Sequence, residues 1–428
     1  MKKTLLIISF LLCSFCGVVT AQNFDKYFVD KTLRIDYLLT GNASGQNIYL
    51  DELASLPQWA GRRHHLSELP VQGNGQVVVT DSLTGARIYV NSFSSLFLEW
   101  ISTPESKKVA KGFEHVVLVP FPRRTVKVET TISNPSGIVV ARIVHFVDPA
   151  DILIHRKGQA NIPAHKYLVK SGNIDNCIDV AIVGEGYTAA EMKTFYDDAE
   201  IACESLFTHE PFKTMKNRFN IVAVSTPSVD SGVSIPGKND WKNTAFMSHF
   251  NTFYSDRYLT TTHLKAINDA IAGVPYEHII VLANTENYGG GGIYNDITLT
   301  AAHHPKFRPV IVHEFGHAFG GLADEYWYEE EESDDIYPKT VEPWEQNITT
   351  RVNFASKWQD MIEKGTPIPT LPADKLKYKV GLYEGAGYSG KGIYRPSYDC
   401  RMRTNEAPEF CPVCQRALKR MINFYTIP

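Results

Sequence analysis

The stretch that most constrains this chain is residues 312–326, which read VHEFGHAFGGLADEY. His313 and His317 are four residues apart, and Glu314 follows the first histidine. Residues four apart on an α-helix share one face, so a helix here directs two imidazoles at one cation. Two neutral histidines with an open coordination position suit Zn²⁺, which lowers the pKa of a bound water to about 7. Glu314 is placed to take a proton from such a water, so the pattern predicts zinc-dependent hydrolysis of peptide bonds.

The third metal ligand is expected shortly after this helix. In metzincins it lies three residues beyond the glycine at which the chain turns. Counting from Gly320 gives Ala323, which has no ligating atom, whereas counting from Gly321 gives Asp324. We therefore predict that the helix turns at Gly321 and that Asp324 is the third ligand. Glu325 is the second choice, and a carboxylate much further along the chain, as in thermolysin, is the third.

The sequence around the motif resembles the bacterial IgA-peptidase family of zinc metallopeptidases. The resemblance is carried by residues 313–326 together with 288–293 (YGGGGI) and 400–403 (CRMR), and it extends to 28–37 (FVDKTLRIDY) and 217–224 (NRFNIVAV). It implies an exported zinc endopeptidase with a metzincin-like core. It does not imply that this chain cuts immunoglobulin A, because members of one family can differ in substrate.

Residues 1–21 have the parts of a signal peptide. Lys2 and Lys3 precede an apolar run over residues 5–19, and the small residues of 19–21 (VTA) precede Gln22. No later stretch is long and apolar enough to span a membrane. We therefore expect a mature protein that is exported and is secreted, periplasmic or on the cell surface.

The charge balance bears on the partner. The formal net charge of −4 becomes −6 once Lys2 and Lys3 are removed. This mild acidity argues against a nucleic-acid partner and leaves a protein or peptide as the expected substrate.

Residues 22–165 are predicted to form a β-rich domain. Short alternating or apolar runs with turn residues between them are typical of a β-sandwich. The expected strands are residues 76–80, 87–90, 115–119, 125–131 and 139–147. The sequence leaves open whether this domain binds substrate or resembles a prodomain.

Residues 166–428 are predicted to form the catalytic domain, in which strands and helices alternate before the motif. Thr188 and Glu191 form a capping box for a helix over residues 189–207, and a second helix is expected over 259–272, capped near Thr262. The expected strands are residues 177–183, 219–224 and 278–283. The predicted fold class is thus α+β, an N-terminal β-sandwich followed by a metzincin-like α/β zinc-peptidase domain.

The glycines before the motif suggest how substrate binds. Gly291, Gly292 and Ile293 belong to a predicted edge strand whose bare backbone can pair with an extended peptide. The glycine- and tyrosine-rich residues 381–392 are expected to be a mobile loop on the far wall of the cleft. After this loop, Tyr394 and Tyr398 are candidates to hydrogen-bond the oxyanion of the tetrahedral intermediate.

Two further features follow the motif. Met402 is the candidate for the methionine turn that lies beneath the metal in metzincin-like enzymes, with core packing as its ordinary alternative. The acidic residues 329–335 (EEEESDD) are expected to be a solvated loop, with a Ca²⁺ site or selection of basic substrates as sharper alternatives.

Five of the seven cysteines remain after loss of the signal peptide, so at least one is unpaired or a ligand. These five are Cys177, Cys203, Cys400, Cys411 and Cys414. In an exported protein the first expectation for the last three is one disulfide. A second, structural zinc would need a fourth ligand, which the sequence does not identify.

Two other classes of function remain open. One is a non-catalytic surface module that binds protein or glycan and keeps a vestigial metal site, although the intact Glu314 argues against it. The other is a non-haem iron oxygenase, because two histidines and one carboxylate also suit Fe(II).

Overall fold

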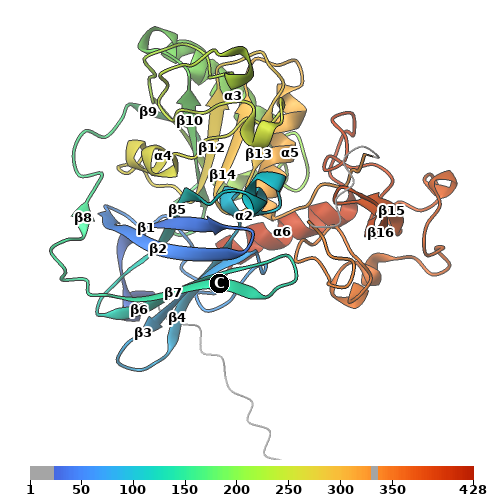
Figure 1. Cartoon of the computed structure of the whole chain (residues 1–428), viewed down its shortest axis with the longest axis horizontal. Coiled ribbons are helices and arrows are strands. Elements are labelled where there is room, and N and C mark those ends of the chain that lie inside the picture. Colours follow the sequence, from blue (N-terminus) through green and yellow to red (C-terminus); the bar gives the residue numbers. More distant parts are fainter. Residues whose placement is uncertain (1–23, 329–335) are drawn as a thin grey trace, which may run out of the picture.

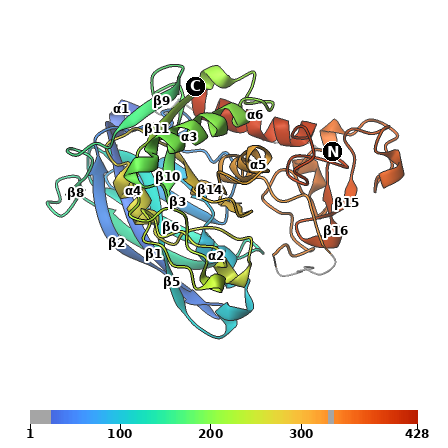
Figure 2. The same cartoon turned by 90° about the horizontal axis from the view of Figure 1, so that it is seen from above.

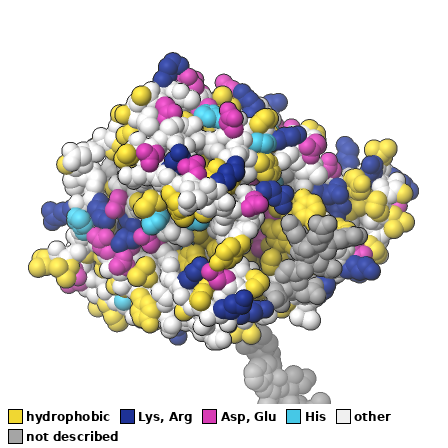
Figure 3. Space-filling view, turned by 45° about the horizontal axis from the view of Figure 1, so that its top comes forward, with side chains coloured by type: hydrophobic (Ala, Val, Ile, Leu, Met, Phe, Trp, Pro, Cys, Tyr) yellow, Lys and Arg dark blue, Asp and Glu magenta, His cyan; other side chains and the backbone are white. Residues whose placement is uncertain are grey.

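The computed structural model describes residues 24–328 and 336–428. The predicted signal peptide lies outside these ranges. The acidic residues 329–335, for which the sequence predicts a solvated loop with a Ca²⁺ site as one alternative, also lie outside them. Within them, no helix combines the length and the apolar character needed to cross a membrane. Basic and acidic side chains are interspersed over the face shown in Figure 3.

The N-terminal part is a sandwich of two four-stranded sheets (Figure 1). One sheet has the order β5-β1-β2-β8 and the other β4-β3-β6-β7. Buried and half-buried side chains alternate along β3 and β6, as expected of strands with one face in a core. The strands are β1 (Phe28–Asn42), β2 (Gly45–Leu56), β3 (Gly75–Asp81), β4 (Arg87–Phe93), β5 (Lys111–Pro122), β6 (Val126–Ser133), β7 (Val139–Val147) and β8 (His155–Arg156). Two short helices, α1 (Phe24–Tyr27) and α2 (Leu96–Ile101), accompany them.

All five strands predicted in this region are present, but the long hairpin of β1 and β2 was not predicted. The pattern of β1 is obscured by two charged residues, Arg34 and Asp36, that are fully buried. It is also shifted by an irregularity in the pairing with β2 between Asp36 and Tyr37. Charged residues in a strand ordinarily indicate a solvated face, so the sequence pattern concealed this strand.

The second part is built on a six-stranded sheet with the order β13-β14-β12-β10-β11-β9. The four central strands are parallel, and the edge strands β9 and β13 run antiparallel to their neighbours. Every residue of β10, β11, β12 and β14 is buried, as is usual for parallel strands covered on both faces. The strands are β9 (His165–Lys170), β10 (Ile178–Glu185), β11 (Phe219–Val224), β12 (His278–Ala283), β13 (Gly290–Gly292) and β14 (Ile297–Ala301).

Helices cover both faces of this sheet. The core on one face contains residues of α3 (Met192–Leu206), α5 (Phe307–Gly320) and α6 (Pro412–Thr426), and the core on the other contains residues of α4 (Leu264–Ala270). Seen from above, α6 extends from the sheet towards the hairpin of β15 (Tyr383–Ala386) and β16 (Ser389–Arg395) (Figure 2). Single 3₁₀ turns complete the chain at Pro104–Lys107, Ala189–Glu191, Lys216–Arg218, Pro236–Lys238, Thr252–Tyr254, Phe354–Ser356, Gln359–Met361 and Pro372–Asp374. The α+β fold class predicted from the sequence is therefore confirmed.

The two helices predicted in this part have different outcomes. The capping box of Thr188 and Glu191 is present and opens a 3₁₀ turn that continues into α3. The prediction of a helix over residues 259–272 was too long, because α4 begins only at Leu264. Thr260 instead pairs with His249, and Thr261 donates its hydroxyl to the Phe246 carbonyl at 2.5 Å. Tertiary hydrogen bonds thus hold the threonines outside the helix.

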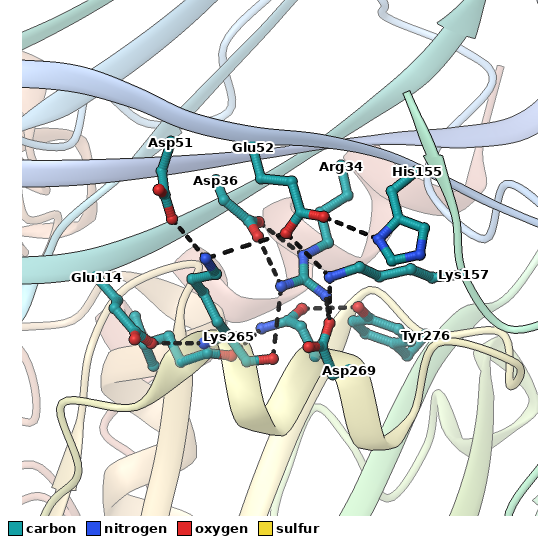
Figure 4. A network of polar contacts seen from close by, with 12 residues as sticks. Arg34, Asp36, Asp51, Glu52, Glu114, His155, Lys157, Lys265, Asp269 and Tyr276 are labelled. Atoms are coloured by element: carbon teal, nitrogen blue, oxygen red, sulfur yellow. Dashed lines mark hydrogen bonds and ion pairs between the residues drawn. The ribbon is translucent and has the colours of Figure 1, made fainter. Parts of the chain in front are cut away.

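An ionic network centred on the buried residues Arg34 and Asp36 joins the two parts of the chain (Figure 4). The Arg34 guanidinium on β1 donates from Nε to Asp36 Oδ1 at 2.7 Å and from Nη1 to Asp269 Oδ1 of α4 at 2.5 Å. Lys157 lies in the connection between the parts, and its Nζ is 2.9 Å from the same Asp269 oxygen. The Nζ of Lys265 in α4 lies 2.5 Å from Oδ2 of Asp51 in β2. These contacts fix the sandwich against α4.

Candidate active site

The predicted metal-binding helix is α5 (Phe307–Gly320), and ten of its fourteen residues are buried. A helix that is apolar on all sides is stable only when it is buried. Its polar side chains His313, Glu314 and His317 all lie at the surface of one cleft. The helix ends as predicted at Gly321, whose φ of 58° is in the left-handed region that glycine adopts without strain.

The turn at Gly321 brings Asp324 back beneath the two histidines. Asp324 Oδ1 lies 3.1 Å from His313 Nε2 and 3.2 Å from His317 Nε2, and the two Nε2 atoms are 3.1 Å apart. The three ligating atoms therefore form a nearly equilateral triangle. Tetrahedral zinc with bonds of about 2.1 Å separates its donor atoms by about 3.4 Å, so the triangle fits such an ion with a small expansion.

The hydrogen bonds of the two histidines favour a cation at this point. His313 Nδ1 lies 2.9 Å from the Arg401 carbonyl oxygen, and His317 Nδ1 lies 2.5 Å from that of Leu322. A carbonyl only accepts, so each Nδ1 carries the proton and each neutral ring turns a bare Nε2 lone pair towards the other. Two lone pairs and a carboxylate oxygen at this distance repel one another unless positive charge lies between them.

The pKa values express the same attraction for positive charge. Burial alone would raise the pKa of Asp324, but the two histidines hold it well below its usual range. Burial would likewise lower the pKa of His317, but Asp324 and Glu314 outweigh that effect and raise it to about 9. Either a proton or a metal ion meets this demand, and the ligand set of two imidazoles and one carboxylate is that of a metal site.

Tyr388 holds Asp324, the predicted third ligand, in place. Its hydroxyl donates a short hydrogen bond to Asp324 Oδ2, which leaves Oδ1 directed at the histidines. The backbone supports this arrangement, because Gly387 N–H donates to the Asp324 carbonyl at 3.0 Å. Tyr326 stacks over the His313 ring with centroids 6.5 Å apart and contacts the Tyr388 ring. A hydrogen bond of this kind fixes the orientation of a metal ligand.

Met402, the candidate for the methionine turn, packs against α5. It is fully buried, and its sulfur would stand 2.7 Å from a Cβ added to Gly316, so it packs against α5 between the two histidines. The preceding residue, Arg401, supplies the carbonyl that receives His313 Nδ1–H. Met402 also accepts a backbone hydrogen bond from Glu325 at 2.8 Å. The turn therefore supports both the helix and the loop that carries Asp324.

Glu314 lies on the side of α5 that faces β13. Its Oε1 would be 3.3 Å from a Cβ added to Gly290, and its carbonyl oxygen 2.1 Å from one added to Gly292. The glycines thus allow β13 to lie directly against the helix. Burial raises the pKa of Glu314, and the neighbouring histidines oppose that shift.

The cleft above these residues has a volume of about 1230 Å³, and both parts of the chain form its walls. Gly291, Gly292 and Ile293 line it as predicted. The sandwich contributes Leu98 and Glu99 of α2, and Glu99 accepts a short hydrogen bond from the Tyr258 hydroxyl. Nothing local in the sequence marks these residues, because they reach the cleft only through the packing of the two parts.

The structure does not bring Tyr394 and Tyr398 to the cleft. Tyr394 lies on β16, where its backbone pairs with Thr349, and the Tyr398 ring contacts Tyr383 and the Arg403 guanidinium. Neither is among the described residues that line the cleft. The tyrosine whose hydroxyl contacts Asp324 is Tyr388, between the two strands of the β15–β16 hairpin. The φ of Tyr388 is 63°, a left-handed conformation that is uncommon for residues other than glycine. The alternation of a strand therefore does not predict the direction of its side chain.

Two further expectations need correction. Glu325, the second choice for the third ligand, points away from the histidines and towards Cys414, whose Sγ is 3.0 Å from its Oε1. The disulfide expected among the C-terminal cysteines is not formed, because all five described cysteines are free thiols.

Comparison with known protein families agrees with this geometry. A family model described as IgA Peptidase M64 matches residues 167–378 and 371–422, and one described as Peptidase M64 N-terminus matches residues 23–143. No curated protein matches the chain. The two family matches follow the order of the sandwich and the six-stranded sheet along the chain. The chain therefore belongs to the IgA peptidase M64 family, and it is a peptidase.

Proposed function

We propose that the chain is an exported, zinc-dependent endopeptidase that cuts extracellular proteins, with His313, His317 and Asp324 as the zinc ligands and Glu314 as the general base. The observation that carries the proposal is the triangle of ligating atoms, in which both Nε2 lone pairs face the Asp324 carboxylate. Such an arrangement needs a cation, and its position in the cleft of a peptidase gives that cation a catalytic role.

When bound, Zn²⁺ would polarise the scissile carbonyl and lower the pKa of a water beside it. Glu314 then takes a proton from the attacking water and later delivers it to the nitrogen of the leaving amine. Tyr388 keeps Asp324 in its ligating orientation. The Arg401 and Leu322 carbonyls hold both histidines in the tautomer that leaves Nε2 free to bind.

The substrate lies extended along the outer edge of β13. The inner edge of this strand pairs with β14, and Tyr258 pairs with its first residue, Gly290. Among the described residues, no strand pairs with the outer edge at Gly291 and Gly292. A peptide can add to this edge through its backbone, which places a carbonyl next to Glu314.

The test compares wild type with Glu314→Gln, with the exposed Glu286→Gln nearby as the matched control. Bound zinc and cleavage of a panel of native and unfolded proteins, including immunoglobulin A, are measured for each. We expect wild type and Glu286→Gln to cut, and Glu314→Gln to bind zinc normally while its kcat/KM falls at least about 100-fold. Undiminished cutting by Glu314→Gln would refute the mechanism. Iron in place of zinc in active protein would favour the oxygenase reading, and zinc without any cleavage would favour a binding module.

Export is tested separately. We expect the mature protein from the native host to begin at Gln22, as read by mass spectrometry of its N-terminal peptide. Retention of residues 1–21 in the purified protein would contradict this part of the proposal.

A further inference from the structure

A second group of metal-ligating side chains lies behind the catalytic site. Cys400, Cys411, Cys414 and Glu325 are all buried, and each offers one ligand atom within 4.8 Å of the others. They come from three places: the loop after α5, the methionine turn and the start of α6. Catalysis as proposed above uses none of these four side chains.

Two of the separations between ligand atoms can be compared with those around a tetrahedral ion. Cys400 Sγ and Cys414 Sγ are 3.8 Å apart, and tetrahedral zinc with Zn–S bonds of about 2.3 Å sets its sulfurs about 3.8 Å apart. Cys414 Sγ lies 3.0 Å from Glu325 Oε1, where the same geometry asks for about 3.6 Å. A small outward movement of the carboxylate supplies that difference.

A disulfide explains the cluster less well. Its sulfurs would have to approach to about 2.05 Å, and pairing any two of the three thiols would leave the third buried and unpaired. A pairing that used Cys414 would also leave Glu325, which is fully buried, without its thiol partner. A metal ion uses all three sulfurs and the carboxylate together.

Backbone amides and a helix N-terminus favour negative charge on two of the three sulfurs. Cys411 N–H donates to Cys400 Sγ at 3.2 Å, and Cys414 N–H donates to Cys411 Sγ at 3.5 Å. Both donors lie at the start of the 15-residue helix α6, where the helix dipole also favours negative charge. Amide groups directed at sulfur in this way stabilise the deprotonated ligand that a metal requires.

Glu325 is positioned as a ligand as well. Asn347 Nδ2 donates to Glu325 Oε1 at 3.0 Å, and the same side chain holds both the N–H and the carbonyl of Ala323 at 2.8 Å. Among the described residues, Glu325 Oε2 has no hydrogen-bond partner although it is buried. A buried carboxylate oxygen without a partner is costly unless a cation receives it.

We propose that Cys400, Cys411, Cys414 and Glu325 bind a second zinc ion, in a closed structural site with four protein ligands. The site has no open position for water or substrate, so it serves stability and not hydrolysis. Its ligands flank those of the catalytic site, because Glu325 follows Asp324 and Cys400 precedes Arg401, which supports His313. Loss of the structural ion should therefore lower the affinity of the catalytic site for zinc.

The test is metal content and thiol count in the whole mature protein. We expect two zinc ions in wild type, one in His313→Ala and one or fewer in Cys400→Ser. Cys203→Ser, which removes a buried thiol of α3 outside the cluster, should keep two. Chelation under denaturing conditions without reductant should release five titratable thiols from wild type, whereas a disulfide would leave three.

Cobalt substitution keeps the proposal testable if Cys400→Ser fails to fold. Only the cysteine cluster can give thiolate-to-cobalt charge-transfer absorption, because the catalytic ligands contain no sulfur. We expect this absorption in wild type, in Glu314→Gln and in His313→Ala alike. Its absence from cobalt-loaded wild type, or a count of three thiols, would overturn the second site. The Glu314→Gln kinetics test hydrolysis independently, so failure of one proposal is distinguishable from failure of the other.

Discussion

Replacement of Gly292 by alanine should lower the rate of cleavage strongly although it changes no catalytic side chain. The added Cβ would meet the Glu314 carbonyl oxygen at 2.1 Å and His317 Cβ at 3.0 Å. Ordinary contact begins at about 3.4 Å, so β13 and α5 must separate by about 1.3 Å at this point. Both neighbours are held in place, because α5 is packed in the core and β13 is paired with β14.

The size of the effect follows from that displacement. A misplacement of about 1 Å in a catalytic site costs roughly 100-fold in rate. The strain of an overpacked contact costs about 1–3 kcal/mol of folding free energy. We therefore expect Gly292→Ala to lower kcat/KM by about 100-fold and to lower the midpoint of urea unfolding measurably. Steady-state cleavage of a fluorogenic peptide substrate gives the first quantity.

Gly291→Ala provides the comparison on the same strand. Its Cβ would meet Tyr258 Cε2 at 2.8 Å and the next atom at 3.6 Å, so only the end of one ring has to move. We expect a loss within about fivefold for this variant. Equal activity of Gly292→Ala and wild type, or a larger loss in Gly291→Ala than in Gly292→Ala, would refute the reasoning that β13 needs glycine to lie against the active helix.

Three other substitutions probe other parts of the molecule. Tyr388→Phe removes the donor to Asp324 and should weaken zinc binding by about 10–100-fold, as measured by competition with a chelator, while unchanged affinity would exclude this role. Burial raises the pKa of Asp179 to about 7, so its carboxyl favours folding while neutral and that contribution is lost as pH rises towards and through 7. The free energy of unfolding of Asp179→Asn minus that of wild type should thus increase by about 3 kcal/mol between pH 5 and pH 8, as measured by urea unfolding. An equal difference at the two pH values would contradict this prediction. Arg34→Met leaves Asp36 buried without its partner and should cost about 3–5 kcal/mol in urea unfolding, and the double variant with Asp36→Leu should recover much of that loss.

The helix that carries His313 and His317 could be predicted because its constraints are local. The spacing of His313 and His317, and the choice of Gly321 over Gly320 as the turn, follow from helical geometry and from the lack of a ligating atom at residue 323. The same local patterns predicted the capping box at Thr188 and most of the strands. A site whose residues all lie in one continuous segment can be predicted from the sequence of that segment.

The parts that could not be predicted depend on contacts between distant segments. Glu325 was considered only as a partner of the histidines, because nothing in the sequence places it beside Cys414, 89 residues further on. The sequence predicts a mobile loop over residues 381–392 and therefore gives no reason to place Tyr388 beside Asp324. In the structure these residues form most of the β15–β16 hairpin. Glu99 reaches the cleft from the other part of the chain. Local patterns contain no information about such pairings.

The edge strand of the cleft is also attached to the sandwich, and this bears on how the enzyme is matured. Ser94 N–H donates to the Tyr294 carbonyl at 2.9 Å, and the Asn295 side chain donates to the Ser92 carbonyl at 2.8 Å, while Ile293 packs into the core of the sandwich. An inhibitory prosegment is discarded to expose a finished active site. This domain instead supplies part of the cleft wall and holds the end of β13, so we expect proteolytic removal of the sandwich to lower cleavage activity and not to raise it.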